Sequence, residues 1–252
     1  MSNRVLVTAG ASGIGLAIAD AFVAAGARVH ICDIDRAALD AVLASREITG
    51  SIADVGNSAQ VAVLAQEALA ALGGVDVIVN NAGIGGPRGP IETISDEAWD
   101  AVLRTNLSSM FFVVRALAPT MKAQRSGSII NISTTSVRTA LPERSAYVVS
   151  KAAVEGLTHN LARELGPFNI RCNTLRPGSI ENERGRMLLE QRAAREGISY
   201  EAALAQRLGF ISMRSRIEPS EVGDAAVFLA SDGARHITGQ CISVCGNVEW
   251  EG

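Results

Sequence analysis

The chain contains 252 residues with a formal net charge of −3 at pH 7, and 48% of the residues are hydrophobic but only 4% aromatic. This length suits one large α/β domain, with a sizeable core that the composition predicts to be mainly alanine, valine, leucine and isoleucine. The absence of a basic block gives no support for a nucleic-acid partner.

The N-terminal residues lead directly into an apolar run, without a charged leader or a cleavage site. No later apolar run is predicted to span a bilayer, so we expect a cytoplasmic protein with no membrane partner. The cysteines lack CxxC spacing and lie in apolar runs, which indicates small buried hydrophobes rather than a metal site. They are Cys32, Cys172, Cys241 and Cys245.

Short apolar runs alternate with longer segments of helical periodicity. Residues 14–25 have the apolar pattern of a core-facing helix, and Gly26 stands where a glycine would end that helix. Repetition of this unit predicts an α/β fold: a doubly wound parallel β-sheet with helices on both faces, in a single domain over residues 1–252. The predicted strands are residues 5–8, 29–32, 51–54, 75–80, 128–133, 170–175 and 241–244.

The turn at residues 8–15 contains Gly10, Gly13 and Gly15 and opens the first helix. Glycines permit unusual backbone angles, and they let a diphosphate approach the positive end of a helix. A plain strand-to-helix turn would look similar. The position after the first strand favours a dinucleotide-binding turn.

Asp33 ends the second predicted strand. A carboxylate there can accept hydrogen bonds from both hydroxyls of an adenosine ribose and repels a 2′-phosphate. The alternative is a helix cap for the segment beginning at Asp35. With the glycine turn upstream, the sequence predicts NAD rather than NADP, although Arg36 is close enough to accommodate the extra phosphate.

Tyr147 and Lys151 lie four residues apart, a spacing that places both on one face of a helix. An unperturbed tyrosine ionises near pH 10. A neighbouring positive charge favours the phenolate and assists proton transfer nearer neutral pH. A surface helix could carry the same pair by coincidence, but the motifs upstream favour a catalytic role.

Residues 183–215 break the regular alternation. They contain two amphipathic helical patterns, from Glu183 to about Arg195 and from Tyr200 to Leu208. This helical insert between the last two strands is predicted to be a lid over the site or an oligomer contact.

Taken together, these motifs resemble the short-chain dehydrogenase/reductase family in its compact form. The resemblance covers nearly the whole chain, and its motifs occur in the family's order. It implies a Rossmann-like fold, an NAD(P)-dependent oxidoreductase acting on CH–OH groups, and a homodimer or homotetramer. The matching positions are the turn at 8–15, Asp33, Asp54-Val55, Asn80-Asn81-Ala82-Gly83, Asn106, the Tyr147/Lys151 pair and Pro177-Gly178.

The family's cofactor contacts carry over residue by residue. Ala9 stands where the family usually has glycine, a small change that we expect to be tolerated. Asn80 and Gly83 would mainly hold the central strand. The implied contacts are Ser12, Gly13, Ile14 and Gly15 with the diphosphate and ribose, Asp54 and Val55 with the adenine, Asn81 with the adenosine ribose region, Lys151 with the nicotinamide ribose beside Tyr147, and Ile180 with the nicotinamide carboxamide.

The resemblance also implies a catalytic set. Tyr147 would exchange the substrate hydroxyl proton, Lys151 would assist it, and Asn106 would support a proton-relay water. The family's serine usually precedes the tyrosine by thirteen positions, which in this chain gives Thr134. Threonine retains the donor and acceptor of serine. Ser133 is the second choice, since alternation turns it to the other side of the strand.

Arg144 precedes Tyr147 by three residues and is a candidate substrate-binding residue, since a guanidinium pairs bidentately with carboxylate or phosphate. This interpretation predicts a polar anionic hydroxy or keto compound, such as a sugar acid. A neutral sugar, polyol or cyclic alcohol is the alternative. Trp250 is expected to pack on a surface, and in tetramers of the family the C-terminus can reach a neighbour's site.

Two other functions are weighed against this one. A dinucleotide-binding regulator without chemistry is disfavoured by the intact Tyr147, Lys151 and Asn106. A sugar-nucleotide epimerase or dehydratase also uses a Tyr-x-x-x-Lys pair, but such chains are usually longer. The apolar segments 107–118 and 152–165 have more hydrophobic surface than one sheet face needs, which is consistent with dimers or tetramers.

Overall fold

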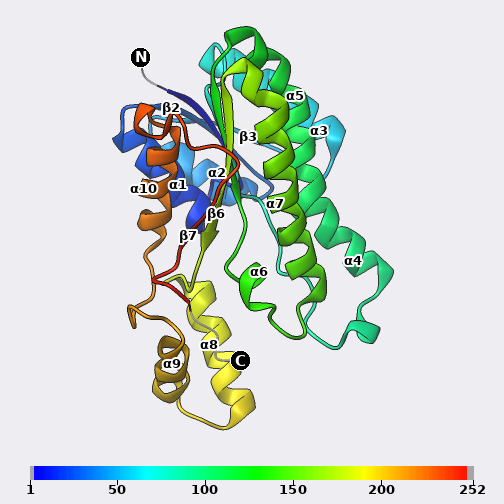
Figure 1. Ribbon diagram of the computed structural model, residues 1–252, viewed down its shortest axis with the longest axis vertical. Coiled ribbons are helices and arrows are strands. Elements are labelled where there is room, and N and C mark those ends of the chain that lie inside the picture. The colour runs from blue at the N-terminus through cyan, green and yellow to red at the C-terminus, as the bar shows by residue number, and fades with distance from the viewer. Residues whose placement is uncertain (1–2, 249–252) are drawn as a thin grey trace.

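The computed structural model describes residues 3–248, except the side chain of Arg184. Within these residues, seven parallel strands form one sheet in the order β3-β2-β1-β4-β5-β6-β7 (Figure 1). The first strand, β1, lies inside the sheet. The chain adds β2 and β3 on one side of it and then β4 to β7 on the other, so the prediction of a doubly wound sheet is confirmed. The strands are β1 (Arg4–Thr8), β2 (Arg28–Asp33), β3 (Thr49–Ile52), β4 (Val77–Asn80), β5 (Gly127–Ile132), β6 (Ile170–Pro177) and β7 (Cys241–Val244).

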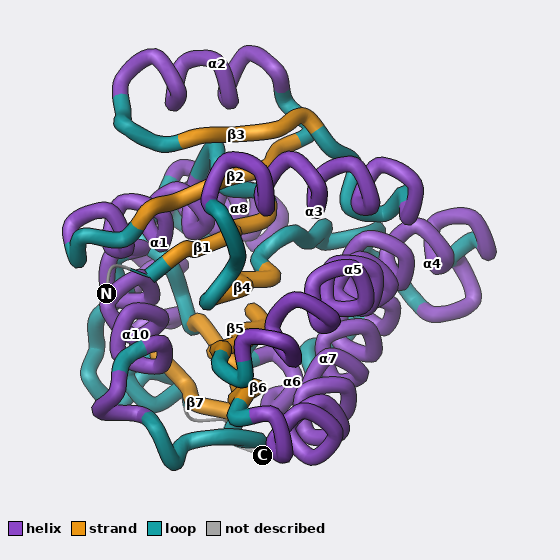
Figure 2. The backbone as a smooth tube through the Cα atoms, turned by 90° about the horizontal axis from the view of Figure 1, so that it is seen from above, coloured by secondary structure: helices purple, strands orange, loops and turns teal. Residues whose placement is uncertain are grey.

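Helices cover both faces of the sheet (Figure 2). One face carries α1 (Gly13–Ala24), α2 (Arg36–Ser45) and α10 (Pro219–Ala230), and the other carries α3 (Ser58–Leu72), α5 (Ser109–Gln124) and α7 (Ser145–Leu165). The remaining helices extend from the domain near the carboxyl ends of the strands (Figure 1). These are α4 (Asp96–Leu103), α6 (Ser136–Thr139), α8 (Glu183–Glu196) and α9 (Tyr200–Gly209).

Two separate cores follow from the alternation of side chains along each strand. In β1, Val5 and Val7 pack with α1 residues such as Phe22, whereas Leu6 packs with α3 residues such as Leu64. The central strands β1 and β4 are buried on both faces, so their residues are mainly apolar in both directions, whereas the edge strand β3 is partly exposed. This explains why the strands appear in the sequence as continuous apolar runs.

Two strand boundaries differ from the prediction. Strand β3 ends at Ile52 instead of residue 54, since Asp54 already belongs to the following turn, where its Oδ1 accepts from the Gly56 N–H at 2.8 Å. Strand β4 begins at Val77 instead of residue 75, since the Asp76 side chain binds Arg4 at the sheet's amino edge.

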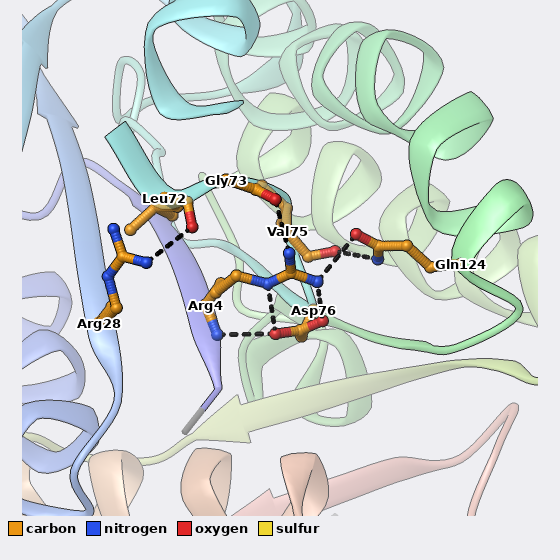
Figure 3. Close-up of polar contacts among 7 residues, drawn as sticks. All are labelled: Arg4, Arg28, Leu72, Gly73, Val75, Asp76 and Gln124. Carbon is orange, nitrogen blue, oxygen red and sulfur yellow. Dashed lines mark hydrogen bonds and ion pairs between the residues drawn. The ribbon is translucent and has the colours of Figure 1, made fainter. Parts of the chain in front are cut away.

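Arg4 organises the amino edge of the sheet (Figure 3). Its Nε donates to Asp76 Oδ2 at 2.9 Å, and its Nη2 donates to Asp76 Oδ1 at 2.6 Å and to Gln124 Oε1 at 2.9 Å. Gln124 in turn donates to the Val75 carbonyl at 2.9 Å. Burial raises the pKa of Asp76, but the hydrogen bonds and charge of Arg4 outweigh it and hold that pKa below its usual value. This edge is therefore fixed by polar contacts, at the opposite end from the turns expected to bind ligands.

The helical run Asp96–Gln124 has 29 residues and is apolar enough, by length and composition alone, to cross a membrane. The sequence pattern predicts no such run. Its buried residues, including Val113 and Leu117, pack in the core beside α3 and against β4 and β5. One such helix is weak evidence for a membrane span, because the core helix of an α/β domain passes the same test.

Candidate active site

The turn between β1 and α1 has the backbone that its glycines allow. Gly13 has a φ of +54°, and a Cβ there would meet no atom of the described chain within 4 Å. Ser12 caps the helix by its backbone, and within the described residues its side chain does not bond to the first turn. Ala9 has a φ of +49°, a left-handed conformation that favours the glycine usual in the family. The turn thus presents open space before the positive end of α1.

Packing explains the third glycine of this turn. A Cβ at Gly15 would collide with the carbonyl oxygen of Ala9 and would lie 2.5 Å from Nδ2 of Asn81. Asn81 Nδ2 donates to the carbonyls of Thr8 and Ala9, both at 3.1 Å. Asn81 therefore ties the end of β4 to the turn, and its contact with the adenosine ribose stays a prediction.

Asp33 lies beside this turn at the end of β2. Its Oδ2 accepts from the Ala11 N–H and its Oδ1 from the Asp35 N–H, both at 3.1 Å. The cap of α2 is Asp35, whose Oδ1 accepts from Ala38 at 3.1 Å. The alternative role as a helix cap thus belongs to Asp35. The Asp33 carboxylate is held against the glycine turn, and its contact with the adenosine ribose stays a prediction.

Asp54 and Val55 follow β3 at the same edge of the sheet. Val55 is buried at 7% exposure, and Asp54 lines an open hollow together with Glu97, Asp100 and Arg104. The Asp54 N–H donates to Gln60 Oε1 at 2.8 Å. These contacts fix the turn after β3, and the adenine contacts predicted for Asp54 and Val55 remain predictions.

Tyr147 and Lys151 both lie in α7, one turn apart, with Tyr147 half-buried. Lys151 is buried at 3% exposure, and its Nζ donates to the carbonyl of Ile132 at 2.7 Å. Burial lowers the pKa of Lys151 from 10.5 to about 8, so its ammonium is still mostly protonated at neutral pH. An ammonium has three N–H donors, so this carbonyl does not exhaust its capacity to bind a ligand.

Asn106 lies in a π-helical turn, Arg104–Ser108, that joins α4 to α5. Its Oδ1 accepts from the Ile84 N–H at 2.7 Å, and its Nδ2 donates to the Ile84 carbonyl at 3.0 Å and to Ser150 Oγ at 2.9 Å. Turns of this kind inside helices often occur at functional sites. Asn106 thereby fixes the loop after β4 against α7, and its proton-relay role remains a prediction.

Gly83 lies in that loop, beside both Asn106 and Lys151. A Cβ at Gly83 would lie 3.2 Å from Asn106 Oδ1 and 3.2 Å from Lys151 Nζ. The sequence interpretation limits Gly83 mainly to holding the central strand. The structure adds that the missing side chain gives Asn106 and Lys151 room beside the loop.

The two candidate hydroxyls have different neighbours. Ser133 Oγ lies 3.1 Å from the Lys151 carbonyl oxygen and 3.0 Å from Glu155 Oε1, and its one O–H donates to these acceptors. The side chain is therefore turned toward α7, below the Tyr147/Lys151 turn. Thr134 Oγ1 donates to Ser136 Oγ and accepts from the Ser136 N–H, both at 3.2 Å. Thr134 therefore lies in the turn that leads to α6, a helix in contact with α7. These contacts favour Thr134 as the hydroxyl available to a substrate.

Arg216 was not identified from the sequence. Its Nη2 donates to the Ile180 carbonyl and its Nη1 to Glu181 Oε1 at 2.8 Å, so it joins both ends of the insert at residues 183–215. Ile180 and Ile217 also form an isolated parallel bridge. A Cβ at Gly185 would collide with Arg216 Nη2 and lie 2.5 Å from the Ile180 carbonyl. A glycine in the first turn of a helix is the sequence signal that could have indicated this close approach.

Arg144 lies beside the predicted catalytic pair. Its Cζ lies 4.6 Å from the centroid of the Tyr147 ring, and its Nη2 donates to the Gly85 carbonyl at 3.0 Å. The guanidinium predicted to bind substrate is therefore held by the protein itself, next to Tyr147. Trp250, the other residue suspected of reaching a site, lies outside the described residues.

The residues present fit a dinucleotide. The open turn before α1, the Asp33 carboxylate and the loop after β4 all lie at the carboxyl ends of adjacent strands, where open α/β sheets bind ligands. Lys151 adds a buried cation beside that loop. Among the described residues, no group of three or more histidine, cysteine, aspartate or glutamate side chains is arranged to hold a metal ion.

Comparison with known proteins gives consistent results. Residues 8–247 match a family model described as enoyl-(acyl carrier protein) reductase. A probable galactose dehydrogenase of Rhizobium meliloti is 37% identical, with 97% of this chain and 94% of the relative aligned.

Two solved structures have nearly the same fold. An NAD⁺-bound xylitol dehydrogenase superposes with a TM-score of 0.91 at 27% identity, over 97% of this chain and 98% of the other. An actinorhodin polyketide ketoreductase with NADPH superposes with a TM-score of 0.91 at 31% identity, over 97% and 96%. The chain belongs to the short-chain dehydrogenase/reductase family and is an NAD(P)-dependent oxidoreductase acting on CH–OH groups.

Proposed function

We propose that this enzyme is an NAD-dependent dehydrogenase that interconverts a secondary alcohol and a ketone on a neutral sugar or polyol. The observation that carries the chemistry is the convergence of Asn106 Oδ1 and Lys151 Nζ on the loop at Gly83, next to Tyr147 in α7. The substrate class is supported by the similarity to a galactose dehydrogenase and a xylitol dehydrogenase.

The preference for NAD is supported by Asp33. Its two oxygens are held by the N–H groups of Ala11 and Asp35, so the carboxylate has a fixed position at the end of β2. A carboxylate accepts from ribose hydroxyls and repels a 2′-phosphate. Arg36 is the residue that could accommodate the 2′-phosphate of NADP. It lines a hollow at the outer edge of β3 together with Thr49 and Glu67.

Each catalytic side chain has a distinct task in this proposal. Tyr147 accepts the hydroxyl proton during oxidation and donates it during reduction, while Lys151 supplies a fixed positive charge beside it. Thr134 orients the substrate oxygen, and Asn106 supports the path by which the proton reaches solvent. The nicotinamide supplies the hydride acceptor or donor when it is bound.

An anionic substrate is the second candidate, because Arg144 stands beside Tyr147. Against it, the Arg144 guanidinium already donates to the Gly85 carbonyl and lies over the Tyr147 ring. A sugar acid would have to compete with those contacts for the same donors.

A parallel substrate screen tests the proposal. The purified protein is mixed with NAD or NADP and with galactose, xylitol, cyclohexanol or galacturonate, and the absorbance of the reduced cofactor is followed. We expect turnover with NAD and at least one neutral sugar or polyol, and none with Tyr147→Phe. Preference for galacturonate would favour the anionic candidate, and cofactor binding without turnover of any of these compounds would favour a regulator.

A further inference from the structure

Arg144 is placed by an unusual piece of backbone. It is the residue before the first turn of α7, and the preceding Glu143 has a φ of +59°. This left-handed residue turns the chain so that the Arg144 side chain returns along α7 to Tyr147, three residues later. The guanidinium then lies over the Tyr147 ring, with Cζ 4.6 Å from the ring centroid.

The same guanidinium also holds the loop after β4. Its Nη2 donates to the Gly85 carbonyl at 3.0 Å, and the Gly89 N–H donates to the Glu143 carbonyl at 3.2 Å. One residue earlier in that loop, Ile84 is fixed by Asn106. The loop is thus attached to the catalytic helix through two side chains, at adjacent residues.

Arginine is suited to both contacts at once. Its guanidinium is planar, so the face can stack on an aromatic ring while the N–H groups at the edge donate in the plane. A lysine at this position could reach one partner as a point charge but could not cover the ring in the same way. The contact therefore restricts the tilt of the Tyr147 ring and sets its distance from the loop.

We propose that Arg144 is a positioning residue that holds the Tyr147 ring and the Gly85 loop in one fixed geometry, rather than a ligand of the substrate. The inference rests on the proposed role of Tyr147 as the acid–base group. It predicts that loss of the guanidinium slows the chemical step for every substrate and leaves substrate and cofactor affinity nearly unchanged.

Nitration by tetranitromethane tests the contact independently of activity. The chain has two tyrosines, Tyr147 and Tyr200, and Tyr200 has its own arginine, Arg186, at 5.8 Å from its ring. Arg144→Lys keeps the positive charge beside Tyr147 but removes the planar group that covers the ring. With peptide mass spectrometry as the readout, Arg144→Lys should speed nitration of Tyr147 several-fold and leave Tyr200 unchanged, and Arg186→Lys should leave Tyr147 unchanged. An unchanged rate at Tyr147 in Arg144→Lys would overturn the proposal.

Kinetics distinguish positioning from substrate binding. With NAD and either galactose or xylitol, kcat of Arg144→Ala should fall about tenfold, with both KM values within about twofold. Arg144→Lys should recover only part of the loss, and it replaces Arg144→Ala if that variant fails to fold. Arg138→Ala, which removes an exposed charge from α6, is the matched control and should keep wild-type kcat.

Two further outcomes are decisive. A rise in KM for galacturonate with kcat unchanged would identify Arg144 as a substrate clamp and overturn the positioning role. If the wild type turns over no alcohol or ketone but the nitration result holds, the proposed function fails while the contact between Arg144 and Tyr147 stands.

Discussion

The hydroxyl of Ser133 donates to Glu155 Oε1 at 3.0 Å, and the same carboxylate pairs with Arg176, whose Nε lies 2.6 Å from Oε1 and whose Nη2 lies 2.5 Å from Oε2. Ser133 and Glu155 are both buried, at 4% and 8% exposure. Ser133 thus belongs to a buried polar network between β5, α7 and β6. Thr134, the next residue, has no part in it.

Ser133→Ala should therefore affect mainly stability, and Thr134→Ala mainly turnover. Ser133→Ala should lower the free energy of unfolding by about 1–2 kcal/mol and change kcat little, because it removes a buried donor from Glu155. Thr134→Ala should lower kcat about 100-fold, because it removes a hydroxyl that orients the reacting oxygen. Its loss of stability should be smaller than that of Ser133→Ala, since its hydrogen bonds reach only Ser136, two residues away.

Thermal unfolding and steady-state kinetics with NAD measure both effects. Thr134→Ser is the control and should keep most of the activity, since serine offers the same donor and acceptor. Loss of turnover in Ser133→Ala, with Thr134→Ala active, would show that the catalytic assignment is wrong.

Lys151 should make stability depend on pH in the alkaline range. Its folded pKa of about 8 lies below the ordinary 10.5, so the unfolded chain binds more protons between these values and stability rises with pH across them. Lys151→Met has no group that titrates at this position, so its stability lacks this dependence on pH. The variant should be more stable than wild type near pH 7 by about 1–3 kcal/mol, with the difference narrowing toward pH 10.

Denaturant unfolding at a series of pH values measures that difference. The Ile132 carbonyl loses its donor in Lys151→Met, which lowers the stability of the variant equally at every pH and leaves the narrowing intact. The control is Lys122→Met. Lys122 lies in α5, which covers the same face of the sheet as α7, but it is outside the site. A constant offset between Lys151→Met and wild type from pH 7 to 10 would contradict the buried-charge explanation.

Local sequence patterns predicted the sheet, and they also identified the candidate residues at its carboxyl edge, whose roles stay predictions. The alternation of β1, Gly26 at the end of α1 and the four-residue spacing of Tyr147 and Lys151 each depend on a few neighbouring residues, so they could be recognised without the fold. Even the direction of Ser133 follows from strand alternation, since it lies on the α7 side as the parity of β5 requires.

Contacts between distant residues could not be predicted in this way. Arg216 binds the carbonyl of Ile180, 36 positions earlier. Gly185 could have indicated that some group lies close to the helix, but not that the group is Arg216 or that its partner is a backbone carbonyl. The π-helical turn at Asn106 is another example, because its residues read as the beginning of an ordinary helix. The lid or oligomer role of residues 183–215 likewise depends on partners that helical periodicity does not identify.

Arg216 should control cofactor binding, because it fixes the backbone at Ile180, the residue expected to meet the nicotinamide carboxamide. Arg216→Ala should weaken NADH binding by about tenfold or more, since removing a charged donor from the half-buried Ile180 carbonyl costs about 1.5–3 kcal/mol. Gly185→Ala should act in the same direction by crowding the Ile180 carbonyl. NADH fluorescence titration measures the dissociation constants.

The control for Arg216 is Arg186→Ala in the same insert. Arg186 pairs only with Glu190 one turn away among the ion pairs of the described chain, and its side chain is 68% exposed. The NADH affinity of Arg186→Ala should equal that of the wild type. Equal affinities for Arg216→Ala and Arg186→Ala would show that the Ile180 carbonyl does not need this anchor.

The amino edge of the sheet should contribute stability without contributing to catalysis. Arg4→Ala removes four hydrogen bonds of the guanidinium, two to Asp76 and one each to Gln124 and the Gly73 carbonyl. It should lower the free energy of unfolding by about 2 kcal/mol, while kcat and KM stay within about twofold. Because the folded pKa of Asp76 is depressed, its contribution is present above its ordinary pKa of 3.8 and is lost as the pH falls below it. The stability difference between wild type and Arg4→Ala should therefore shrink as the pH is lowered from 6 to 3.

Urea unfolding at each pH measures this difference. Arg125→Ala, at the same edge of the sheet, is the control. A loss of kcat in Arg4→Ala would contradict the separation between the amino edge and the site at the carboxyl edge.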